Sequence, residues 1–493
     1  MDAYEYIIPP VQEYRRVPLL LFQTWQTSTL PPLMSRCVHD LITSNPEFKY
    51  QFYDDIRCRS FIQMHFDADV LHAYDTLIPG AYKADLWRYC ILYVYGGIYV
   101  DIKYRCVPPF KLIELTTREH FVRDREFWGI DGIYQALLSC YPRNPILYKC
   151  IRKIVEYVYR MEYGKTCLFI GPHLVRSHFC NLELKQMELS FNGPGIQRGN
   201  KLILTMYPEY RRELKQFATT PHYTELWMER CIYHIKKLHP YQVDDLSKQR
   251  EMNRHTLWAS HPVRTPQGLL LQWTNSVYRE GEIRPCTMVV HTLDGVILPY
   301  SKIEQLRYFQ GQYTGLLYTN KYHVCMCTED ATIIKPDFHA SLYSESHWCM
   351  TTYKGNPCVV YEWYPLQICN IKEGVLSRVD TLYTTPDWFY DLKASTNCVE
   401  WKGSQWVVLT RCYLYKKKGL FMKTYHMLVE IDLEFQIKYS EFFTIGEMSK
   451  VSDLQVTSEG MEIGYTESKG RCYWSKYTWE EVNGLRWTRY GLE

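Results

Sequence analysis

Four charged residues at fixed spacings mark the part of this sequence that could perform chemistry. Asp85 and Arg88 lie three residues apart in a segment with helical periodicity, so both side chains would leave the same face of one helix. Asp101 and Lys103 lie two residues apart in a β-prone run and would therefore share one face of a strand. The pattern predicts two carboxylates and two cations where a strand ends, which is the usual place for a nucleotide crevice in an α/β fold.

The elements that would position these residues are a helix and a short strand separated by two glycines. Apolar residues recur about one helical turn apart after Ala81: Leu86, Cys90 and Tyr93. Gly96 and Gly97 provide the left-handed conformation that commonly ends a helix. Residues 98–100 then form an apolar, β-prone run. The sequence therefore predicts a helix that stops at the glycines and leads directly into a buried strand.

The same stretch resembles a family signature. The pattern Ala81-x-x-x-Asp85-x-x-Arg88-Tyr89, followed by Gly96-Gly97-Ile-Tyr-x-Asp101, is similar to the sugar-binding signature of the DXD-containing glycosyltransferases. That family includes fungal initiating mannosyltransferases and glucosylating bacterial toxins. Four more segments are similar to its strands and active-site loops, in the family's order: residues 17–25, 45–55, 171–173 and 222–227. The resemblance implies a GT-A-like (Rossmann-like) α/β domain that binds a nucleotide-sugar donor.

The resemblance also implies donor-binding roles for individual residues. Asp85 and Arg88 would hold hydroxyl groups of the sugar or ribose, and Trp25 would stack on the nucleobase. His222 and Trp227 lie in a segment similar to a loop that closes over the donor and excludes water. The remaining donor-site candidates are Gly97, Tyr99 and His173. Several of these residues have a structural alternative. Trp25 could be a core residue, and Asp85 and Arg88 a surface helix pair. His222 and Trp227 could form a helix start with a packed aromatic ring, and His173 could be a structural histidine.

Lys103 departs from the family pattern. The family's Asp-x-Asp holds a divalent ion, Mn or Mg, against the diphosphate, whereas this chain has Asp101-Ile-Lys103. Either Asp101 still binds a weakly held ion, with help from His173, or Lys103 itself neutralises the leaving diphosphate without metal. A third alternative is that donor binding has been lost and the two residues form an ordinary ion pair. We predict retained donor binding, with Asp101 and Lys103 as the catalytic residues, because Asp85, Arg88 and Asp101 all match the pattern.

The character of the sequence changes after residue 240. Residues 1–240 alternate predicted strands and helices, whereas residues 241–254 are polar and are predicted to form a linker. In residues 255–493, short aromatic and β-branched runs alternate with glycine turns such as Lys354-Gly355 and Lys402-Gly403, which is typical of antiparallel hairpins. At roughly 45 residues per blade, this all-β region would form a propeller of about five blades.

Three short motifs in the second region, residues 328–333, 361–365 and 394–403, resemble blade motifs of the five-bladed propellers of glycoside hydrolases and mannoside phosphorylases. They contain four acidic residues: Glu329, Asp330, Glu362 and Glu400. Paired carboxylates would suit glycoside cleavage. The alternative, which we favour, is that these acids satisfy turns or bind a glycan without cleaving it.

Charge and cysteine content exclude several classes of protein. The 57 basic and 54 acidic residues nearly balance, so we expect no nucleic-acid or anionic-membrane partner. The first residues carry no basic cluster, and the apolar run at residues 17–22 is too short for a signal peptide or a transmembrane segment. The 18 cysteines are scattered, which fits a reducing compartment. We therefore expect a cytoplasmic protein, unlike the membrane-anchored Golgi members of the resembled family.

These observations favour a two-domain glycosyltransferase (a hexosyltransferase) that uses a UDP- or GDP-sugar. The acceptor would be a glycan or glycoprotein, which the propeller binds or trims. The resemblance implies retention of anomeric configuration, and the arrangement is similar to enzymes that large DNA viruses encode. Two alternatives stay open: a glycan-binding protein with an inactive transferase domain, and a propeller glycosidase or phosphorylase.

Overall fold

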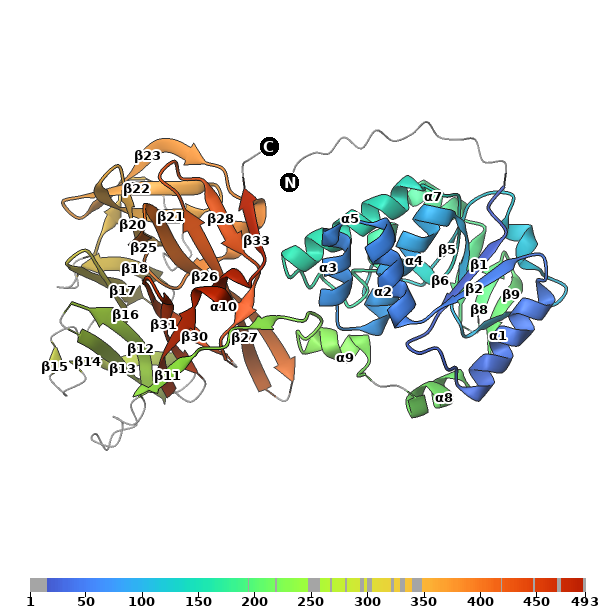
Figure 1. Cartoon of the computed structure of the whole chain (residues 1–493), viewed down its shortest axis with the longest axis horizontal. Helices are drawn as coiled ribbons and strands as arrows, with labels where there is room; N and C mark the ends of the chain where they lie inside the picture. The colour runs from blue at the N-terminus through green and yellow to red at the C-terminus, as the bar shows by residue number, and fades with distance from the viewer. Residues whose placement is uncertain are drawn as a thin grey trace. The chain divides into compact units, whose positions relative to one another are not determined.

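The protein, described by a computed structural model, forms two compact units (Figure 1). The first unit ends at His234, before the residue 240 expected from the sequence, and the second begins at Ile235. The described residues are 16–193, 195–217, 220–246, 258–266, 268–279, 282–292, 297–298, 304–320, 323–328, 333–338, 348–417, 419–446, 448–467 and 471–490.

The first unit contains a nine-stranded sheet in the order β2-β1-β3-β6-β5-β7-β8-β9-β4. Its strands are β1 (Leu20–Thr24), β2 (Lys49–Tyr53), β3 (Gly97–Val100), β4 (Tyr104–Cys106), β5 (His120–Arg123), β6 (Ile133–Cys140), β7 (Leu189–Asn192), β8 (Gly195–Arg198) and β9 (Lys201–Met206). β1 runs parallel to both β2 and β3, whereas β3 is antiparallel to β6. The strands that carry the signature therefore lie inside the sheet, next to its parallel part.

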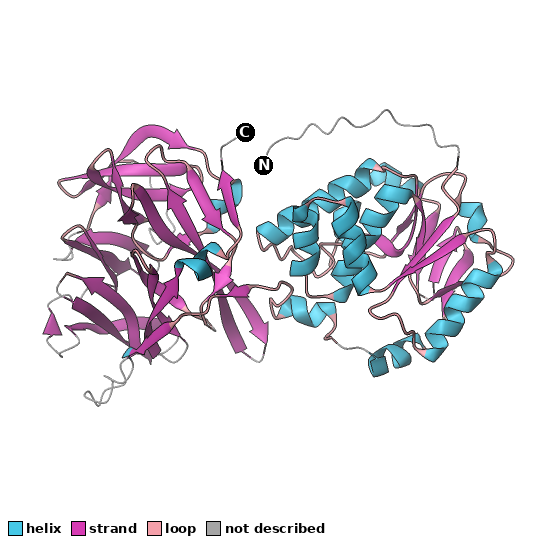
Figure 2. Cartoon of the chain, in the orientation of Figure 1, coloured by secondary structure: helices cyan, strands magenta, loops and turns pink. Residues whose placement is uncertain are grey.

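Helices flank this sheet (Figure 2). They are α1 (Pro32–Ser44), α2 (Asp55–His65), α3 (Ala68–Thr76), α4 (Gly80–Tyr95), α5 (Pro145–Tyr159), α6 (Pro172–Arg176), α7 (Asn181–Gln186), α8 (Tyr210–Phe217) and α9 (Tyr223–Met228), with a 3-10 helix at Leu112–Leu115. The apolar side of α1 packs through Met34 and Cys37 against Ile102. The expected alternation of strands and helices in the first unit is confirmed.

The junction of α4 and β3 is buried inside this unit. Residues 85–92 of α4 are all buried, and every residue of β3 is buried as well. The helix stops at Gly96, whose φ is +63°, and Gly97 follows with φ +104°. A Cβ atom on Gly97 would lie 2.7 Å from the carbonyl oxygen of Leu20 in β1, so only glycine allows β1 and β3 to approach here.

The second unit is strand-rich, as expected, and its described strands form five sheets. Three of these sheets are each built from strands that are consecutive in the sequence. The first comprises β12 (Trp258–Thr265), β13 (Gly268–Arg279), β14 (Glu282–Thr292) and β15 (Ile297–Leu298), and the second comprises β16 (Glu304–Phe309), β17 (Gln312–Asn320) and β18 (His323–Thr328). The third comprises β19 (Lys335–Pro336), β20 (Cys349–Tyr353), β21 (Asn356–Trp363), β22 (Leu366–Lys372) and β23 (Val375–Tyr383). The predicted turns at Lys354-Gly355 and Lys402-Gly403 are present, with positive φ at both residues of each pair.

The other two sheets include strands from the start and the end of the unit. One comprises β10 (Lys236–Lys237), β24 (Lys393–Ala394), β25 (Val399–Trp401), β26 (Ser404–Lys417), β27 (Gly419–Ile431), β28 (Ile437–Ser440), β29 (Phe443–Thr444) and β33 (Trp487–Tyr490). The other comprises β11 (Gln242–Asp245), β30 (Lys450–Val456), β31 (Gly460–Glu467) and β32 (Arg471–Thr478), and α10 (Trp479–Asn483) follows it. A 3-10 helix spans Asp387–Asp391.

The segment expected to be a linker, residues 241–254, contains β11, which pairs antiparallel with β32. Residues 247–254 lie outside the described residues. Within the described part of the chain, none of the helices is both long enough and apolar enough to span a bilayer. A propeller arrangement of the five sheets stays a prediction at this point.

Gly97 generates a prediction about stability. We expect Gly97→Ala to lower the free energy of unfolding of the first unit by about 2 kcal/mol or more, because the new Cβ meets a backbone oxygen and the backbone conformation is unfavourable for alanine. Calorimetric unfolding of the full chain measures this. Gly80→Ala is the control, since a Cβ there meets nothing within 4 Å. Equal transitions for the two variants would contradict the prediction.

Candidate active site

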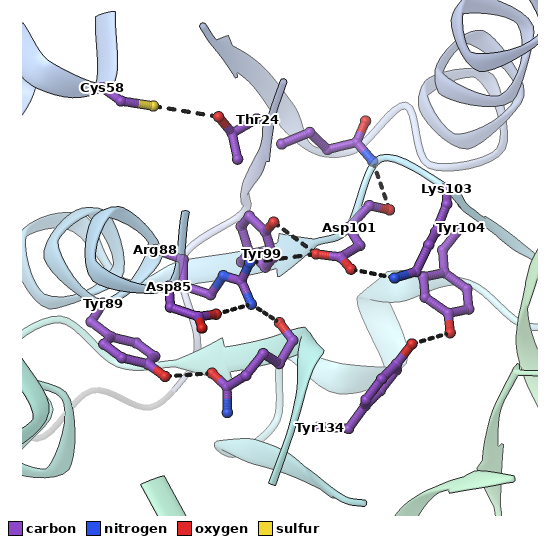
Figure 3. A network of polar contacts seen from close by, with 12 residues as sticks. Thr24, Cys58, Asp85, Arg88, Tyr89, Tyr99, Asp101, Lys103, Tyr104 and Tyr134 are labelled. Carbon is purple, nitrogen blue, oxygen red and sulfur yellow. Dashed lines mark hydrogen bonds and ion pairs between the residues drawn. The ribbon is translucent and has the colours of Figure 1, made fainter. Parts of the chain in front are cut away.

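The predicted charged residues meet at the end of β3 (Figure 3). Arg88 of α4 lies at the centre, and its Nη1 donates to Asp85 Oδ1 at 2.9 Å and to the carbonyl oxygen of Gln135 at 2.8 Å. Its Nη2 lies 3.7 Å from Asp101 Oδ1. The side chains of Arg88 and Asp85 are only 6% and 9% exposed. They are therefore a buried pair, and not the surface helix pair that was the structural alternative.

The carboxylate of Asp101 accepts hydrogen bonds from two further side chains. The hydroxyl of Tyr99 donates to Oδ1 at 2.8 Å, and Lys103 Nζ donates to Oδ2 at 2.7 Å. Burial alone would raise the pKa of Asp101, but the charges of Lys103 and Arg88 outweigh it and bring the pKa down to about 2. Burial alone would lower the pKa of Lys103, but the negative charge of Asp101 raises that pKa above its ordinary value. Asp101 and Lys103 are thus both charged at neutral pH.

Three tyrosine rings surround the ammonium of Lys103. Their centroids lie 5.5 Å (Tyr104), 5.8 Å (Tyr134) and 5.7 Å (Tyr210) from Nζ, within the range of a cation–π interaction. The hydroxyls of Tyr104 and Tyr134 lie 2.8 Å apart and hydrogen-bond to each other. The sequence predicted none of these rings. Tyr104 of β4 directly follows Lys103, whereas Tyr134 of β6 and Tyr210 of α8 are distant in the chain and no local spacing connects them to it.

The loop at Gly171 contacts the buried carboxylate of Asp85. A Cβ on Gly171 would lie 2.3 Å from Asp85 Oδ2, so a larger residue would displace either the loop or the carboxylate. Burial raises the pKa of Asp85 to about 6, although the neighbouring Arg88 partly lowers it. The segment 171–173, picked out in the sequence for its similarity to an active-site loop, is therefore packed against this residue.

His173, in the first turn of α6, hydrogen-bonds to Thr166, a residue just before this helix. Its Nδ1 lies 2.8 Å from Thr166 Oγ1, and its buried Nε2 has no hydrogen-bond partner among the described residues. Burial lowers the pKa of this imidazole, which favours the neutral form. Trp25 follows β1, is half-buried, and packs partly against a cluster that contains Met34 and Tyr207. The donor-binding roles of His173 and Trp25 therefore stay predictions.

The segment that resembles a closing loop forms the start of α9. His222 is exposed and caps the helix, with Nδ1 accepting from the Thr224 amide at 3.3 Å. Trp227 is buried, and its Nε1 donates to the Tyr163 carbonyl at 2.5 Å. Between them, burial raises the pKa of the Tyr223 phenol to about 12, and the Tyr223 ring centroid lies 5.8 Å from that of Tyr82 on α4. Tyr223, which the sequence did not single out, thus contacts α4, the helix that carries Asp85 and Arg88.

The acids predicted in the second unit are not assembled into a described site. Glu362 is half-buried in β21, whereas Glu400 is exposed in β25, which belongs to a different sheet. Glu329 and Asp330 lie outside the described residues. No pairing of carboxylates for glycoside cleavage can be built from the described members of this set.

The residues around Asp101 do not match the oxygen-rich set that Mn²⁺ or Mg²⁺ requires. Both carboxylate oxygens of Asp101 already accept from Tyr99 and Lys103. Throughout the part of the chain that the structure describes, no three His, Cys, Asp or Glu side chains gather closely enough to hold a metal ion. The position of the second family carboxylate is occupied by a positive charge.

Comparison with known proteins agrees with this geometry. Residues 31–121, which include α1 to β3 and the charged cluster, match the model of the family described as "glycosyltransferase sugar-binding region containing DXD motif". The match is confined to the N-terminal part of the chain. The resemblance inferred from the signature is confirmed for this part.

Curated relatives include mannosyltransferases. Inositol phosphoceramide mannosyltransferase 1 of Schizosaccharomyces pombe is 26% identical over 38% of this chain and 59% of its own length. Inositol phosphoceramide mannosyltransferase 3 of the same yeast is 33% identical over 35% of this chain and 47% of its length. An uncharacterized glycosyltransferase of Acanthamoeba polyphaga mimivirus is 33% identical over 18% and 37%. The chain thus spans less than two thirds of each of these relatives.

The Asp101–Lys103 pair generates a second prediction. We expect Asp101→Asn and Lys103→Met each to destabilise the first unit, and the double variant to be less destabilised than the sum, because each single change leaves one charge unpaired. The coupling energy from urea unfolding should be about 1–3 kcal/mol. The control pair is Arg59 and Asp75, 2.7 Å apart but 46% and 40% exposed, where coupling should be weaker. Additive effects at the buried pair would contradict the prediction.

Proposed function

We propose that this protein is a glycosyltransferase that binds a nucleotide sugar at the charged cluster of Asp85, Arg88, Asp101 and Lys103. The observation that carries the proposal is the position of this cluster: it lies at the end of β3, inside the segment that matches the sugar-binding family. Arg88 is held by two carboxylates and a carbonyl before any donor arrives. A site fixed in this way can orient a sugar without reorganising its charges.

In this proposal Asp85 and Arg88 hold the sugar or ribose hydroxyls, and Lys103 faces the diphosphate. An ammonium is a competent partner for phosphate oxygens, and its three tyrosine neighbours leave it charged while limiting its contact with water. Lys103 thereby supplies positive charge that a divalent ion supplies in an Asp-x-Asp site. Asp101 fixes the direction of the ammonium through the 2.7 Å hydrogen bond.

The transfer would proceed with retention. The bond between the anomeric carbon and the donor phosphate oxygen breaks, and the acceptor oxygen forms its bond to that carbon on the same face. The acceptor's proton moves to the leaving phosphate, so that no protein base is required. Lys103 stabilises the negative charge that develops on the leaving diphosphate.

The names of the relatives make mannose the first sugar to test. Inositol phosphoceramide mannosyltransferases and an initiation-specific α-1,6-mannosyltransferase of Candida albicans are among the similar proteins. A donor panel should therefore contain GDP-mannose together with other GDP- and UDP-sugars. The acceptor class remains that expected from the sequence, a glycan or a glycoprotein.

We also propose that the second unit is a five-bladed propeller that binds the acceptor glycan. Contacts between successive sheets support a closed ring. β12 packs against β16 of the next sheet, Arg307 of β16 donates to the Trp348 carbonyl beside β20, and Asn397 beside β25 accepts from the Met350 amide. β25 packs against β30, and β12 packs against β30–β32 of the last sheet.

Removal of Lys103 tests the catalytic proposal. We expect the protein to release nucleotide from at least one donor of the panel in the presence of a chelator, and Lys103→Ala to slow this release about a hundredfold, since the leaving diphosphate loses its positive partner. Lys153→Ala, at an α5 lysine that pairs with Glu156 on its own helix, is the matched control.

Three outcomes would count against the proposal. Turnover by Lys103→Ala equal to that of the unaltered chain would exclude the metal-free role of Lys103. Loss of all turnover with chelator, restored by Mn²⁺, would show that Asp101 binds an ion after all. No turnover and no thermal stabilisation by any donor would favour the glycan-binding alternative.

The raised pKa of Asp85 generates a pH prediction. Asp85 is ionised mainly above its pKa of about 6, and only the ionised form keeps the ion pair with Arg88 and accepts charge-assisted hydrogen bonds from sugar hydroxyls. We therefore expect kcat/KM for donor hydrolysis to fall about tenfold per pH unit below pH 6. Asp85→Asn should remove this dependence while lowering kcat/KM throughout. A flat profile between pH 5 and 8 in the unaltered chain would refute the assignment.

A further inference from the structure

Trp128 occupies an unusual turn between β5 and β6. The amide of Phe127 donates to the Ile130 carbonyl at 2.9 Å, and the amide of Ile130 donates back at 3.2 Å, which closes a two-residue turn over Trp128 and Gly129. Both residues of the turn have positive φ, +53° for Trp128 and +75° for Gly129. This turn type favours asparagine, aspartate or glycine at its first position, and a bulky aromatic residue there is strained.

The same turn recurs elsewhere in the chain with a different first residue. Among the described residues of the second unit, four turns have positive φ at both positions and glycine at the second: Gln310-Gly311, Lys354-Gly355, Glu373-Gly374 and Lys402-Gly403. In each of them the first residue is polar and exposed. Trp128 is exposed as well, to 61% of its surface, although tryptophan is usually well buried. Neither the turn nor burial accounts for a tryptophan at this position.

Neighbouring aromatic rings hold the indole in place. Phe127 stacks on it with centroids 5.2 Å apart and planes inclined by 15°, and Trp227 meets it edge-on at 6.1 Å. Trp227 is itself held by the hydrogen bond from its Nε1 to the Tyr163 carbonyl. The Arg230 guanidinium also lies 4.5 Å from the centroid of the Trp227 ring. Trp128 is thus an exposed ring with a fixed orientation.

The loop that carries this ring packs against a segment that contacts the proposed donor site. Trp227 and Tyr223 belong to the same short helix, and the Tyr223 ring centroid lies 5.8 Å from that of Tyr82 on α4, the helix that carries Asp85 and Arg88. At the base of the Trp128 loop, the Asp124 amide donates to the Gly132 carbonyl at 2.8 Å. A Cβ atom on Gly132 would lie 3.2 Å from the Pro172 Cβ, and Pro172 follows Gly171, which packs against Asp85. Through Pro172 on one side and through α9 on the other, the loop is therefore connected to the elements that hold Asp85.

We propose that Trp128 is a stacking platform for a pyranose ring of the acceptor. The inference rests on the proposed transferase function and adds to it, because it assigns an acceptor subsite to the first unit. A flat apolar face that is fixed in place can cover the C–H face of a sugar ring while the ring's hydroxyls stay in water. The continuity between this ring and the charged cluster favours an acceptor sugar over a lipid surface as its occupant.

The substitution Trp128→Asn tests the proposal, since asparagine suits the turn. The thermal midpoint should stay the same or rise, which separates a binding role from a structural one. In reactions with donor, the ratio of transfer to hydrolysis should fall about tenfold, with the loss appearing in the acceptor KM. Ile56→Asn, at an α2 residue 77% exposed, is the control and should leave this ratio unchanged.

A second measurement does not require turnover. Saturation-transfer NMR of the full chain with methyl α-mannopyranoside, methyl β-glucopyranoside and methyl β-galactopyranoside should show contact with at least one glycoside, and Trp128→Asn should weaken it. No contact with any of the three, or equal contact in both proteins, overturns the proposal. Sedimentation with phosphatidylcholine–phosphatidylserine vesicles that depends on Trp128, with unchanged glycoside contact, also overturns it and assigns the ring to a membrane.

The two proposals fail separately in this design. If no donor of the panel releases nucleotide, the transferase function fails, while the NMR measurement still decides whether Trp128 contacts a sugar ring. If nucleotide is released and Trp128→Asn transfers as well as the unaltered chain, the donor site stands and the role of Trp128 is refuted.

Discussion

The buried guanidinium of Arg88 is the constraint on which the first unit depends. A cation that is only 6% exposed is tolerated because Asp85, Asp101 and a main-chain carbonyl all face it, and because the Tyr99 ring lies 4.5 Å from its centre. These partners come from α4, from β3 and its end, and from β6. Holding one cation therefore fixes three elements relative to one another, and it places two carboxylates at the end of the central strand.

Glycine determines how closely the backbone approaches this cluster. Gly97 lets β3 pair with β1, and Gly171 lets the loop before α6 contact Asp85 without displacing it. In both places a single Cβ would meet an oxygen at 2.7 Å or less. The charged site is thus built from ordinary elements whose close approach requires the absence of side chains.

Lys103 changes the electrostatics of the site without changing its architecture. The two carboxylates, Asp85 and Asp101, are matched by two cations, Arg88 and Lys103, so the cluster is neutral before a donor binds. The second carboxylate of the family pattern would leave an excess of negative charge, which suits a divalent ion. Here the compensating charge is covalently attached and enclosed by tyrosines, which is why we expect the chemistry to tolerate chelators.

The sequence by itself determined the local part of this protein: the α4 helix, its end at Gly96, the buried β3 strand, and the charged residues that share their faces. These follow from spacing over fewer than about ten residues, which propensity and periodicity can capture. Only the tertiary structure decided that Tyr134 and Tyr210 join Tyr104 around Lys103, and that Trp128 lies against Trp227. Those contacts join residues far apart in the chain, and their energies depend on packing that no local pattern encodes.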